Sequence, residues 1–381
     1  MISFAFWATV INYLDRQTLS VAAPVLREHF HMSNMEYSRV VFAFLLAYTV
    51  SNGISGPIID RLGTKLGYAL CMLWWSVAAL LHSFATGAIS LGMFRFLLGI
   101  GEAGNWPAGV KVATEWFPES ERALASGIFN SGSAVGAVGL IWLVLWLPSY
   151  RTPHAIAAEL DEPPIPIREL VRTRFVIWFT FSKIFLDPVW YFYLFWFPEY
   201  LKRARGFDMA AIGKYSWIPF AVAGAGNFLG GGFSGWLLRR GASITVARKA
   251  AVSLFAVLMT SAIGAVLVQQ AWLAIGLVSI AMFGYTGSLA NMLALPGDVF
   301  PKNSVASVYG LASMGSGFGG MLFTLITGWL VDHYSYTPVF IGFGVLPLIC
   351  VTILWLLVGE LRQIRVTTIR SVILEQAAIP N

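Results

Sequence analysis

The chain has 381 residues, of which 57% are hydrophobic and 12% are charged, and its mean hydropathy is +0.71. Soluble proteins carry about 25% charged residues, so a disordered chain and a soluble enzyme with an ordinary surface are both excluded. The net charge of +6 does not point to nucleic acid, because the basic residues flank apolar segments, where membrane topology explains them.

Apolar runs long enough to cross a membrane follow one another along the chain, and a spanning helix takes roughly 20 such residues. We place them at 2–24, 37–59, 65–86, 88–112, 122–147, 175–200, 212–238, 246–268, 271–297, 304–331 and 337–358. They predict an all-α membrane protein. A polar stretch separates the first five runs from the last six. We therefore expect an N-terminal helical bundle at 1–147 and a C-terminal helical bundle at 175–360. A cytoplasmic linker at 148–174 joins them, and a cytoplasmic tail follows at 361–381.

The two bundles repeat a sequence pattern. Pro118 is followed by glycines at +9, +14 and +18, and Pro301 is followed by glycines at the same three spacings. The segment GPIIDR at 56–61 likewise resembles GWLLRR at 235–240. Two matches in the same order and at nearly the same offset predict a duplicated half.

The repeat also predicts a deletion. Two apolar runs follow Pro301, but only one follows Pro118, so the first half is about 28 residues short. The joint falls at Val138-Gly139, where a glycine-spaced helix changes abruptly to the sequence IWLVLW. We infer a twelve-span ancestor with about eleven spans left in this chain, since a twelve-span frame puts most Lys and Arg on the inside. A protein that natively has eleven spans is the alternative.

Ionisable side chains inside spans are candidates for function, because a charge in the membrane is costly. They are Asp15 and Arg16 in the first run, Arg95 and Glu102 in the fourth, and Lys183 and Asp187 in the sixth. Arg95 and Glu102 are seven residues apart and therefore share a helix face. A carboxylate in apolar surroundings takes up a proton readily unless a cation opposes it, so an anion that displaces the cation couples its binding to a proton. Ion pairs that only hold helices together are the alternative.

Polar and aromatic residues near these charges suit a sugar-like ligand, which is held by amides, hydroxyls and stacked rings. They are Asn12, Tyr13, Tyr48, Asn105, Trp106, Asn130, Ser131, Trp190, Tyr193, Asn227 and Asn291. Such residues can instead anchor helices at the membrane interface or link them to one another. Arginine presents a forked donor that suits a carboxylate, which favours an anionic substrate.

An enzyme is not expected, because the catalytic motifs HExxH and GxSxG are absent and the polar loops are short. Cys71 and Cys350 lie in apolar runs and imply neither a disulfide nor a metal site. We expect no cofactor, and a monomer in the lipid bilayer.

Several motifs resemble those of the major facilitator superfamily. The segment GPIIDRLGTK at 56–65 resembles its loop signature, and RFLLGIGEA at 95–103 resembles its fourth-helix motif. Three further segments are similar to its anion:cation symporter family, namely NYLDR at 12–16, EAGNWP at 102–107 and EWFP at 115–118. Three others resemble the hexuronate transporter branch of that family, namely DPVWYFYLFW at 187–196, WIP at 217–219 and the glycine-rich 224–235.

The resemblance implies two pseudo-symmetric helical bundles that import a sugar-acid anion with a proton by alternating access, in a bacterial inner membrane. The implied substrate is a hexuronate such as galacturonate or glucuronate. Asp15 and Glu102 match the proton-titrating carboxylates, Arg16 the ligand of the substrate carboxylate, and Arg95 the coupling arginine. An importer of another organic anion (an aldonate or aldarate) and an inactive, internally truncated remnant are the alternatives.

The sugar-binding positions implied by the resemblance are Tyr13, Tyr48, Ser133 and Asn291, and the aromatic pattern adds Trp190 and Tyr193. Near Asn291 this branch usually carries a His and a Trp, where the present chain has Tyr285 and Ser288.

A gating loop is expected at Gly56, Asp60, Arg61 and Gly63, on a cytoplasmic turn. There the Asp60 carboxylate can hold the N-terminus of a neighbouring helix and favour the outward-open state. A simple capping and topology signal is the alternative reading of this loop.

Overall fold

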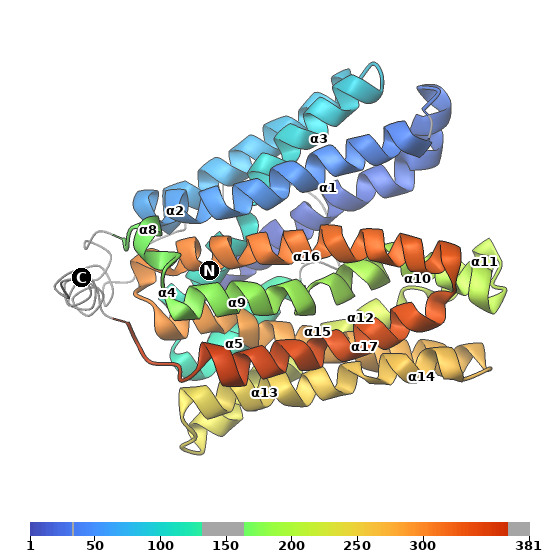
Figure 1. The fold of residues 1–381 in the computed structure, drawn as a ribbon. Helices are drawn as coiled ribbons and strands as arrows, with labels where there is room; N and C mark the ends of the chain where they lie inside the picture. The colour runs from blue at the N-terminus through green and yellow to red at the C-terminus, as the bar shows by residue number, and fades with distance from the viewer. Residues whose placement is uncertain (33, 132–163, 365–381) are drawn as a thin grey trace, which may run out of the picture.

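The computed structural model describes residues 1–32, 34–131 and 164–364, and every regular element within these ranges is a helix (Figure 1). The all-α prediction is thus confirmed for the described residues. The predicted joint at Val138-Gly139, the candidate Ser133 and most of the predicted linker and tail lie outside them.

The N-terminal half contains five α-helices among the described residues. They are α1 (Ile2–His29), α2 (Asn34–Leu81), α3 (Ala88–Glu102), α4 (Asn105–Trp116) and α5 (Glu119–Ser131), with a 3₁₀ turn η1 (His82–Phe84) between α2 and α3. The α2 helix holds two predicted spans. They are separated at Gly63, whose φ of 78° and ψ of 157° break the helix. This φ lies in the left-handed region that only glycine enters easily, which explains the glycine at this turn.

The C-terminal half runs from α8 to the end of the described chain. Its helices are α8 (Ile167–Leu170), α9 (Arg174–Leu186), α10 (Pro188–Arg205), α11 (Met209–Tyr215), α12 (Ile218–Arg239), α13 (Ile244–Met259), α14 (Ser261–Leu267), α15 (Ala271–Val299), α16 (Val305–His333) and α17 (Tyr336–Ile353), with the turns η3 (Lys302–Ser304) and η4 (Leu354–Val358). The eleven predicted apolar runs fall mainly on helix where the structure describes them, although short turns interrupt several, as at Ala103-Gly104, Ser216-Trp217 and Thr260. The run at 175–200 is broken at Asp187-Pro188 into α9 and α10.

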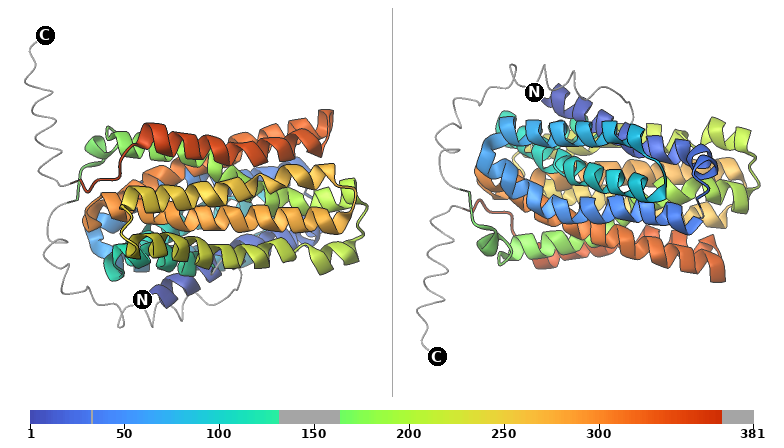
Figure 2. Two further views of the ribbon diagram at one scale, coloured as in Figure 1. Left: turned by 90° about the horizontal axis from the view of Figure 1, so that it is seen from below. Right: turned by 90° about the horizontal axis from the view of Figure 1, so that it is seen from above.

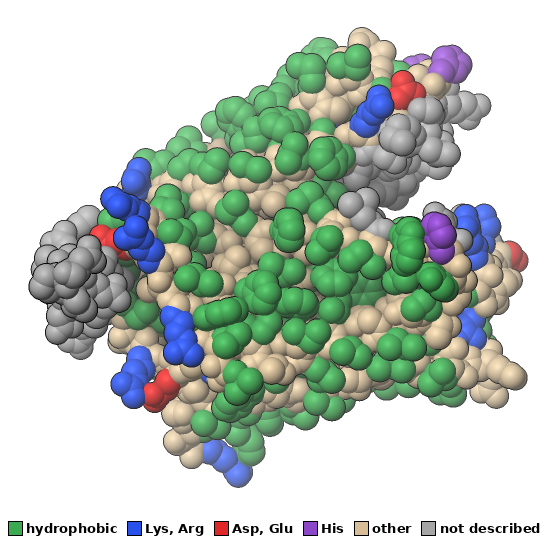
Figure 3. All heavy atoms as spheres, viewed as in Figure 1, with side chains coloured by type: hydrophobic (Ala, Val, Ile, Leu, Met, Phe, Trp, Pro, Cys, Tyr) green, Lys and Arg blue, Asp and Glu red, His purple; other side chains and the backbone are tan. Residues whose placement is uncertain are grey.

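Five stretches of the described residues have the length and apolar composition needed to cross a membrane, and the first of them holds both legs of α2. They are Phe42–Phe84, Arg174–Leu194, Ile244–Leu267, Ala271–Val299 and Tyr336–Val358. Large apolar side chains such as Ile54, Leu80 and Leu229 are more than half exposed on the outside of the bundle. Figure 3 shows apolar side chains over the middle of the visible face, with Lys and Arg gathered toward the ends. This distribution fits a surface that faces lipid.

The two halves meet through two equivalent helix pairs, α2 with α16 and α5 with α12. A Cβ added to Gly56 on α2 would lie 2.1 Å from the carbonyl oxygen of Ala306 at the start of α16. A Cβ added to Gly235 on α12 would lie 2.3 Å from the carbonyl oxygen of Ser120 at the start of α5. Gly56 and Gly235 are matching positions of the sequence repeat. The repeat therefore explains why the close contacts between the halves come as a pair.

We call the end of the molecule at which α5 and α16 begin the closed end, because both helix pairs touch there. Toward the opposite end, α1, α2 and α3 diverge from α16 (Figure 1), and the space-filling view shows a notch between them (Figure 3). Figure 2 shows α1–α3 on one face of the bundle and α12–α15 on the other. In the predicted topology the closed end is cytoplasmic, so the notch opens to the outside.

Candidate functional site

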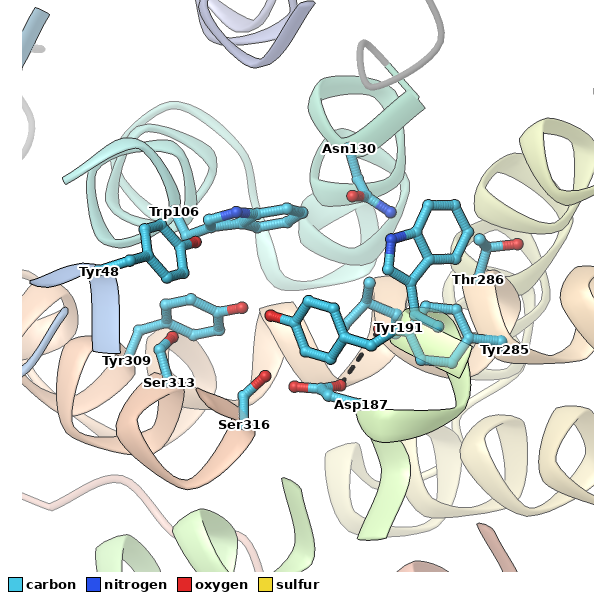
Figure 4. A pocket seen from close by; sticks show the side chains of 12 residues that line it. Tyr48, Trp106, Asn130, Asp187, Tyr191, Tyr285, Thr286, Tyr309, Ser313 and Ser316 are labelled. Carbon is cyan, nitrogen blue, oxygen red and sulfur yellow. Dashed lines mark hydrogen bonds between the residues drawn. The ribbon is translucent and has the colours of Figure 1, made fainter. Parts of the chain in front are cut away.

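A pocket of about 550 Å³, including its open mouth, lies between the two halves (Figure 4). The N-terminal half contributes Tyr48, Trp106 and Asn130, from α2, α4 and α5. The C-terminal half contributes Asp187, Trp190, Tyr191, Tyr285, Thr286, Leu289, Tyr309, Ser313 and Ser316.

The wall formed by the C-terminal half is aromatic and rich in hydroxyl groups. Trp190 stacks on Tyr285, with ring centroids 5.4 Å apart and an interplanar angle of 22°. On the opposite side Phe44 stacks on Tyr48 at 5.8 Å and so fixes the direction of that tyrosine. Rings next to hydroxyl and amide groups can bind a ligand that has both apolar C–H faces and hydroxyls.

The break between α9 and α10 places a buried ion pair beside this wall. Asp187 ends α9, and Pro188 takes the first position of α10, where its missing N–H costs no hydrogen bond. The Nζ of Lys183 lies 2.7 Å from Oδ2 of Asp187, one helical turn away. The Tyr285 hydroxyl donates to Oδ1 of Asp187 at 3.2 Å. Sequence reasoning marked Lys183 and Asp187 as ionisable residues within a span but gave them no place in the binding site.

Charged residues of the N-terminal half lie where α1 meets α3. Arg95 and Glu102 are both buried, with 4% and 0% of their surfaces exposed. The Nη1 of Arg95 donates to the backbone carbonyl of Asp15 at 3.1 Å, and Nδ2 of Asn12 donates to the carbonyl of Glu102 at 3.5 Å. Thus three of the predicted coupling residues, Asp15, Arg95 and Glu102, are held at one helix junction.

The close approach of α3 to α2 depends on small residues of α3. A Cβ at Gly101 would lie 2.7 Å from the backbone nitrogen of Trp75, and a Cβ at Gly99 would lie 2.6 Å from the carbonyl oxygen of Phe44. Both glycines belong to the motif at 95–103. They let α3 pack directly on α2, and Glu102 follows at the end of α3.

The predicted sugar-binding residues divide into two groups. Tyr48 and Trp190 line the pocket. Tyr193 lies elsewhere, because its side chain is fully buried among Phe192, Phe197 and Phe340. The side chains of Tyr13 and Arg16 on α1, like Ser133, lie outside the described residues.

Asn291 also lies apart from the pocket lining. It is fully buried, and its Nδ2 donates to the carbonyl oxygens of Gly230 at 2.9 Å and Gly287 at 3.0 Å. The bond to Gly230 ties α15 to α12, whereas Gly287 belongs to α15 itself. The structure thus places Tyr193 and Asn291 in helix packing, where the sequence suggested ligand contact.

The polar face of α16 was missed by sequence reasoning. Tyr309, Ser313 and Ser316 all line the pocket, and the run at 304–331 was marked only as a span. Their spacing of four and then three residues is a signal that could have revealed one polar helix face. Serine also occurs often in membrane helices as a packing residue, which hid the pattern.

At the closed end, the Asp60 carboxylate contacts the N-terminus of α16. It accepts hydrogen bonds from the backbone N–H groups of Ala306 at 3.2 Å and Ser307 at 2.6 Å. Its Oδ1 also lies 2.7 Å from Nζ of Lys111, and both side chains are fully buried. The carboxylate therefore joins α2 and α4 of one half to α16 of the other. Arg61, by contrast, is exposed.

The second contact between the halves has a different charge cluster. Asp298, at the end of α15, binds Arg248 on α13 at 2.7 Å and Arg122 on α5 at 3.0 Å. Arg248 also donates to the Ser234 hydroxyl at 2.9 Å and to the Glu119 carbonyl at 2.6 Å. Because Arg122 and Glu119 belong to the N-terminal half, this cluster also links the two halves.

Comparison with known proteins supports the same fold and transport class. The protein-family model for the Major Facilitator Superfamily matches residues 5–139 and 244–372 of this chain. The chain is 30% identical to a hexuronate transporter of Escherichia coli strain K12, over 93% of this chain and 92% of the relative. It is 28% identical to a D-galactonate transporter of Escherichia coli O6:H1, over 94% and 95% of the two chains. It is 29% identical to a probable galactarate/D-glucarate transporter of Bacillus subtilis strain 168, over 94% and 91%.

Solved structures of low sequence identity share the fold. The proton:xylose symporter XylE has a TM-score of 0.71 at 12% identity, over 97% of this chain and 98% of its own. The transporter FucP has a TM-score of 0.70 at 14% identity, over 94% and 97% of the two chains. The predicted fold of two helical bundles is therefore confirmed.

The alignment to the hexuronate transporter of Escherichia coli strain K12 also contains gaps. It runs over 402 positions, whereas 93% of the 381 residues of this chain is about 354, so about 48 positions have no residue of this chain.

Proposed function

The chain belongs to the major facilitator superfamily, and from this premise we propose that it imports a sugar-acid anion together with a proton by alternating access. It is a multi-pass membrane transporter and not an enzyme. The proposed substrates are hexuronates such as galacturonate or glucuronate. The proposed location is a bacterial inner membrane, since the relatives described above are bacterial. We propose that one chain, as a monomer, forms the transport unit.

One observation carries the proposal above the others. The pocket between the halves has aromatic and hydroxyl-bearing walls, and the buried Glu102 and Arg95 lie with Asp15 at the junction of α1 and α3. A sugar acid has matching parts, because its hydroxyls and ring suit the first surface and its carboxylate suits a cation. The 30% identity to a hexuronate transporter over nearly the whole chain supports the same substrate class.

The coupling scheme uses Asp15 and Glu102 as proton carriers and Arg95 and Arg16 as cations. In the empty transporter the arginines stabilise the ionised acids. A substrate carboxylate that binds Arg16 removes part of this compensation, so an acid in an apolar environment takes up a proton. The anion and proton then cross together. The contact of Arg95 with the backbone of Asp15 supports a shared network between α3 and α1.

Arg16→Ala is expected to weaken binding of galacturonate by about 100-fold, because loss of one partner of a desolvated charge pair typically costs about 2–5 kcal/mol. Arg16→Lys keeps the charge without the forked donor and should bind with intermediate affinity. Isothermal titration of the purified protein in detergent measures both. An Arg16→Ala variant that binds galacturonate as tightly as the wild type contradicts the role of Arg16.

We also propose that Gly56, Asp60, Arg61 and Gly63 form a gating loop that favours the outward-open state. Gly63 supplies the turn, and Gly56 allows the close approach of α2 to the start of α16. The Asp60 carboxylate adds a negative charge where the dipole of α16 is positive. Opening of this end requires these contacts to break, so they act as a latch and do not bind substrate.

Asp60→Asn is expected to shift the equilibrium between the two conformations at least tenfold, about 1.4 kcal/mol. The shift favours the conformation in which the two halves separate at the closed end. The reason is that the buried Lys111 loses its counter-charge and α16 loses its anionic partner. Spin labels at Glu121→Cys and Glu360→Cys, with Cys71 and Cys350 replaced by Ser, report the distance between the halves at this end. Asp208→Asn makes the same chemical change at an exposed helix cap and serves as the control. A large change in substrate affinity with an unchanged distance distribution contradicts the latch.

Two other functions have specific support. Relatives named as galactonate and galactarate/D-glucarate transporters match as much of the chain as the hexuronate transporter does. This favours an aldonate or aldarate as an alternative substrate. The alignment positions that lack a residue of this chain, about 48 in total, support the second alternative, an internally truncated remnant without transport activity.

The test of the proposed function is uptake of labelled galacturonate by cells that express the chain. The same cells should also express a version in which the missing helices are restored from a relative. Saturable uptake by both supports an active transporter as the sequence stands. Uptake by the restored version alone identifies the present chain as the remnant, and uptake by neither excludes this substrate. The coding DNA across Val138-Gly139 shows whether a longer reading frame exists.

A further inference from the structure

We propose that Asp187 and Lys183 determine substrate specificity, as a pair that makes the transporter take sugar acids with one carboxylate in preference to those with two. The inference rests on the proposed function and adds a role for two residues of the pocket wall. The carboxylate of Asp187 binds hydroxyl groups at the end of the substrate that lies away from its own carboxylate. It repels a second carboxylate placed at that end.

The geometry leaves the acid, and not the cation, facing the ligand. Asp187 lines the pocket, whereas Lys183 is not part of its lining and is only 1% exposed. The Lys183 ammonium lies behind Asp187, 2.7 Å from Oδ2 and 5.2 Å from the centre of the Tyr309 ring. Figure 4 shows the carboxylate directed into the space between the walls, with Tyr48, Trp106 and Asn130 on the far side. A ligand therefore meets the negative end of a buried ion pair.

The hydrogen-bonding capacity of this carboxylate is only partly used. An ionised carboxylate accepts at roughly four lone-pair positions and donates none. Lys183 occupies a position on Oδ2, and the Tyr285 hydroxyl occupies one on Oδ1. Each oxygen thus retains capacity to accept a hydrogen bond from a substrate hydroxyl. The contact with Lys183 fixes the position of this carboxylate, and a carboxylate is a stronger hydrogen-bond acceptor than a neutral amide.

The same arrangement discriminates against a diacid. A uronate or aldonate bound by its carboxylate on the N-terminal half presents hydroxyls toward Asp187, and these donate. An aldarate of the same length presents a second carboxylate, which has no proton to donate and carries a like charge. Specificity of this kind comes from a repulsive element as well as an attractive one.

The test is competition against labelled galacturonate for binding to the purified full chain in detergent, with unlabelled galacturonate and galactarate as competitors. For the wild type we expect galactarate to compete at least tenfold more weakly. For Asp187→Asn we expect the ratio of the galactarate to the galacturonate inhibition constant to fall at least tenfold. The repulsive charge is gone, and the Lys183 ammonium is left to attract the second carboxylate. The double variant Lys183→Met, Asp187→Asn should bind galactarate more weakly than Asp187→Asn does, because the ammonium is also gone. Its affinity for galacturonate should equal that of Asp187→Asn.

Tyr285→Phe is the matched control. It removes the other hydrogen bond to Asp187 but leaves the charge, so it should keep the wild-type ratio. A wild type that binds galactarate as tightly as galacturonate overturns the inference and leaves sugar-acid transport intact. An unchanged ratio in Asp187→Asn also overturns it and assigns the pair to helix packing. Binding of neither sugar acid by the wild type overturns the proposed function itself.

Discussion

Glu102→Gln is expected to abolish accumulation of galacturonate driven by a pH gradient, while exchange of galacturonate across the membrane continues. Glutamine resembles the protonated acid, so the variant still binds substrate and still changes conformation, but it no longer carries a proton. With one proton per anion, a gradient of two pH units supports roughly 100-fold accumulation, since each unit corresponds to about 1.36 kcal/mol. With the variant, the ratio of internal to external galacturonate concentration should stay near 1.

Counterflow exchange and gradient-driven uptake, measured on the same proteoliposome preparation, separate these two abilities. Glu121→Gln changes an exposed glutamate at the closed end and is the control, which should accumulate like the wild type. Full accumulation by Glu102→Gln contradicts its role in coupling. The burial of Glu102 would then be explained by packing between α3 and α1.

Asp298→Ala is expected to have the largest effect on stability. It leaves Arg122 and Arg248, which are 7% and 0% exposed, without the carboxylate that both now bind. Removal of one partner from a buried ion pair typically lowers the free energy of unfolding by about 3–5 kcal/mol, because an uncompensated charge stays buried. Thermal unfolding of the purified protein, followed by tryptophan fluorescence, should show a clearly lower melting temperature than that of the wild type.

A combined variant identifies the cause of this loss. Replacement of all three charged residues, as Arg122→Met, Arg248→Met and Asp298→Ala, removes the unpaired charges and should recover much of the stability. If Asp298→Ala unfolds like the wild type, the cluster does not hold the closed end together. If the triple variant is as unstable as Asp298→Ala, lost packing and not charge is the cause.

Most of the helices could be predicted from the sequence, for a physical reason. In lipid every backbone polar group must be satisfied within its own segment, so apolar runs of spanning length form helices almost regardless of their neighbours. The repeat likewise predicted equivalent positions in the two halves, and the contacts of Gly56 and Gly235 follow it. The break at Asp187-Pro188 was not expected, because a run of aromatic residues continues through it.

The site could be predicted only in part, because contacts between distant helices leave little trace in one sequence. Tyr48 and Trp190 line the pocket, but Tyr193 is one helical turn further on and is buried among the aromatic residues of its own half. Arg122 and Asp298 are 176 positions apart, and no local pattern relates them. The carboxylate of Asp60 does contact a helix N-terminus, which its place in a recognisable motif suggested.

In the proposed function, sugar acid and proton move together through this chain. The most direct measurement places purified protein in liposomes, adds labelled galacturonate outside, and records external pH and internal label together. We predict that the external medium becomes more alkaline as galacturonate enters, and that Glu102→Gln abolishes this pH change. Entry of galacturonate without any proton movement, and without a response to an imposed pH gradient, would contradict the account.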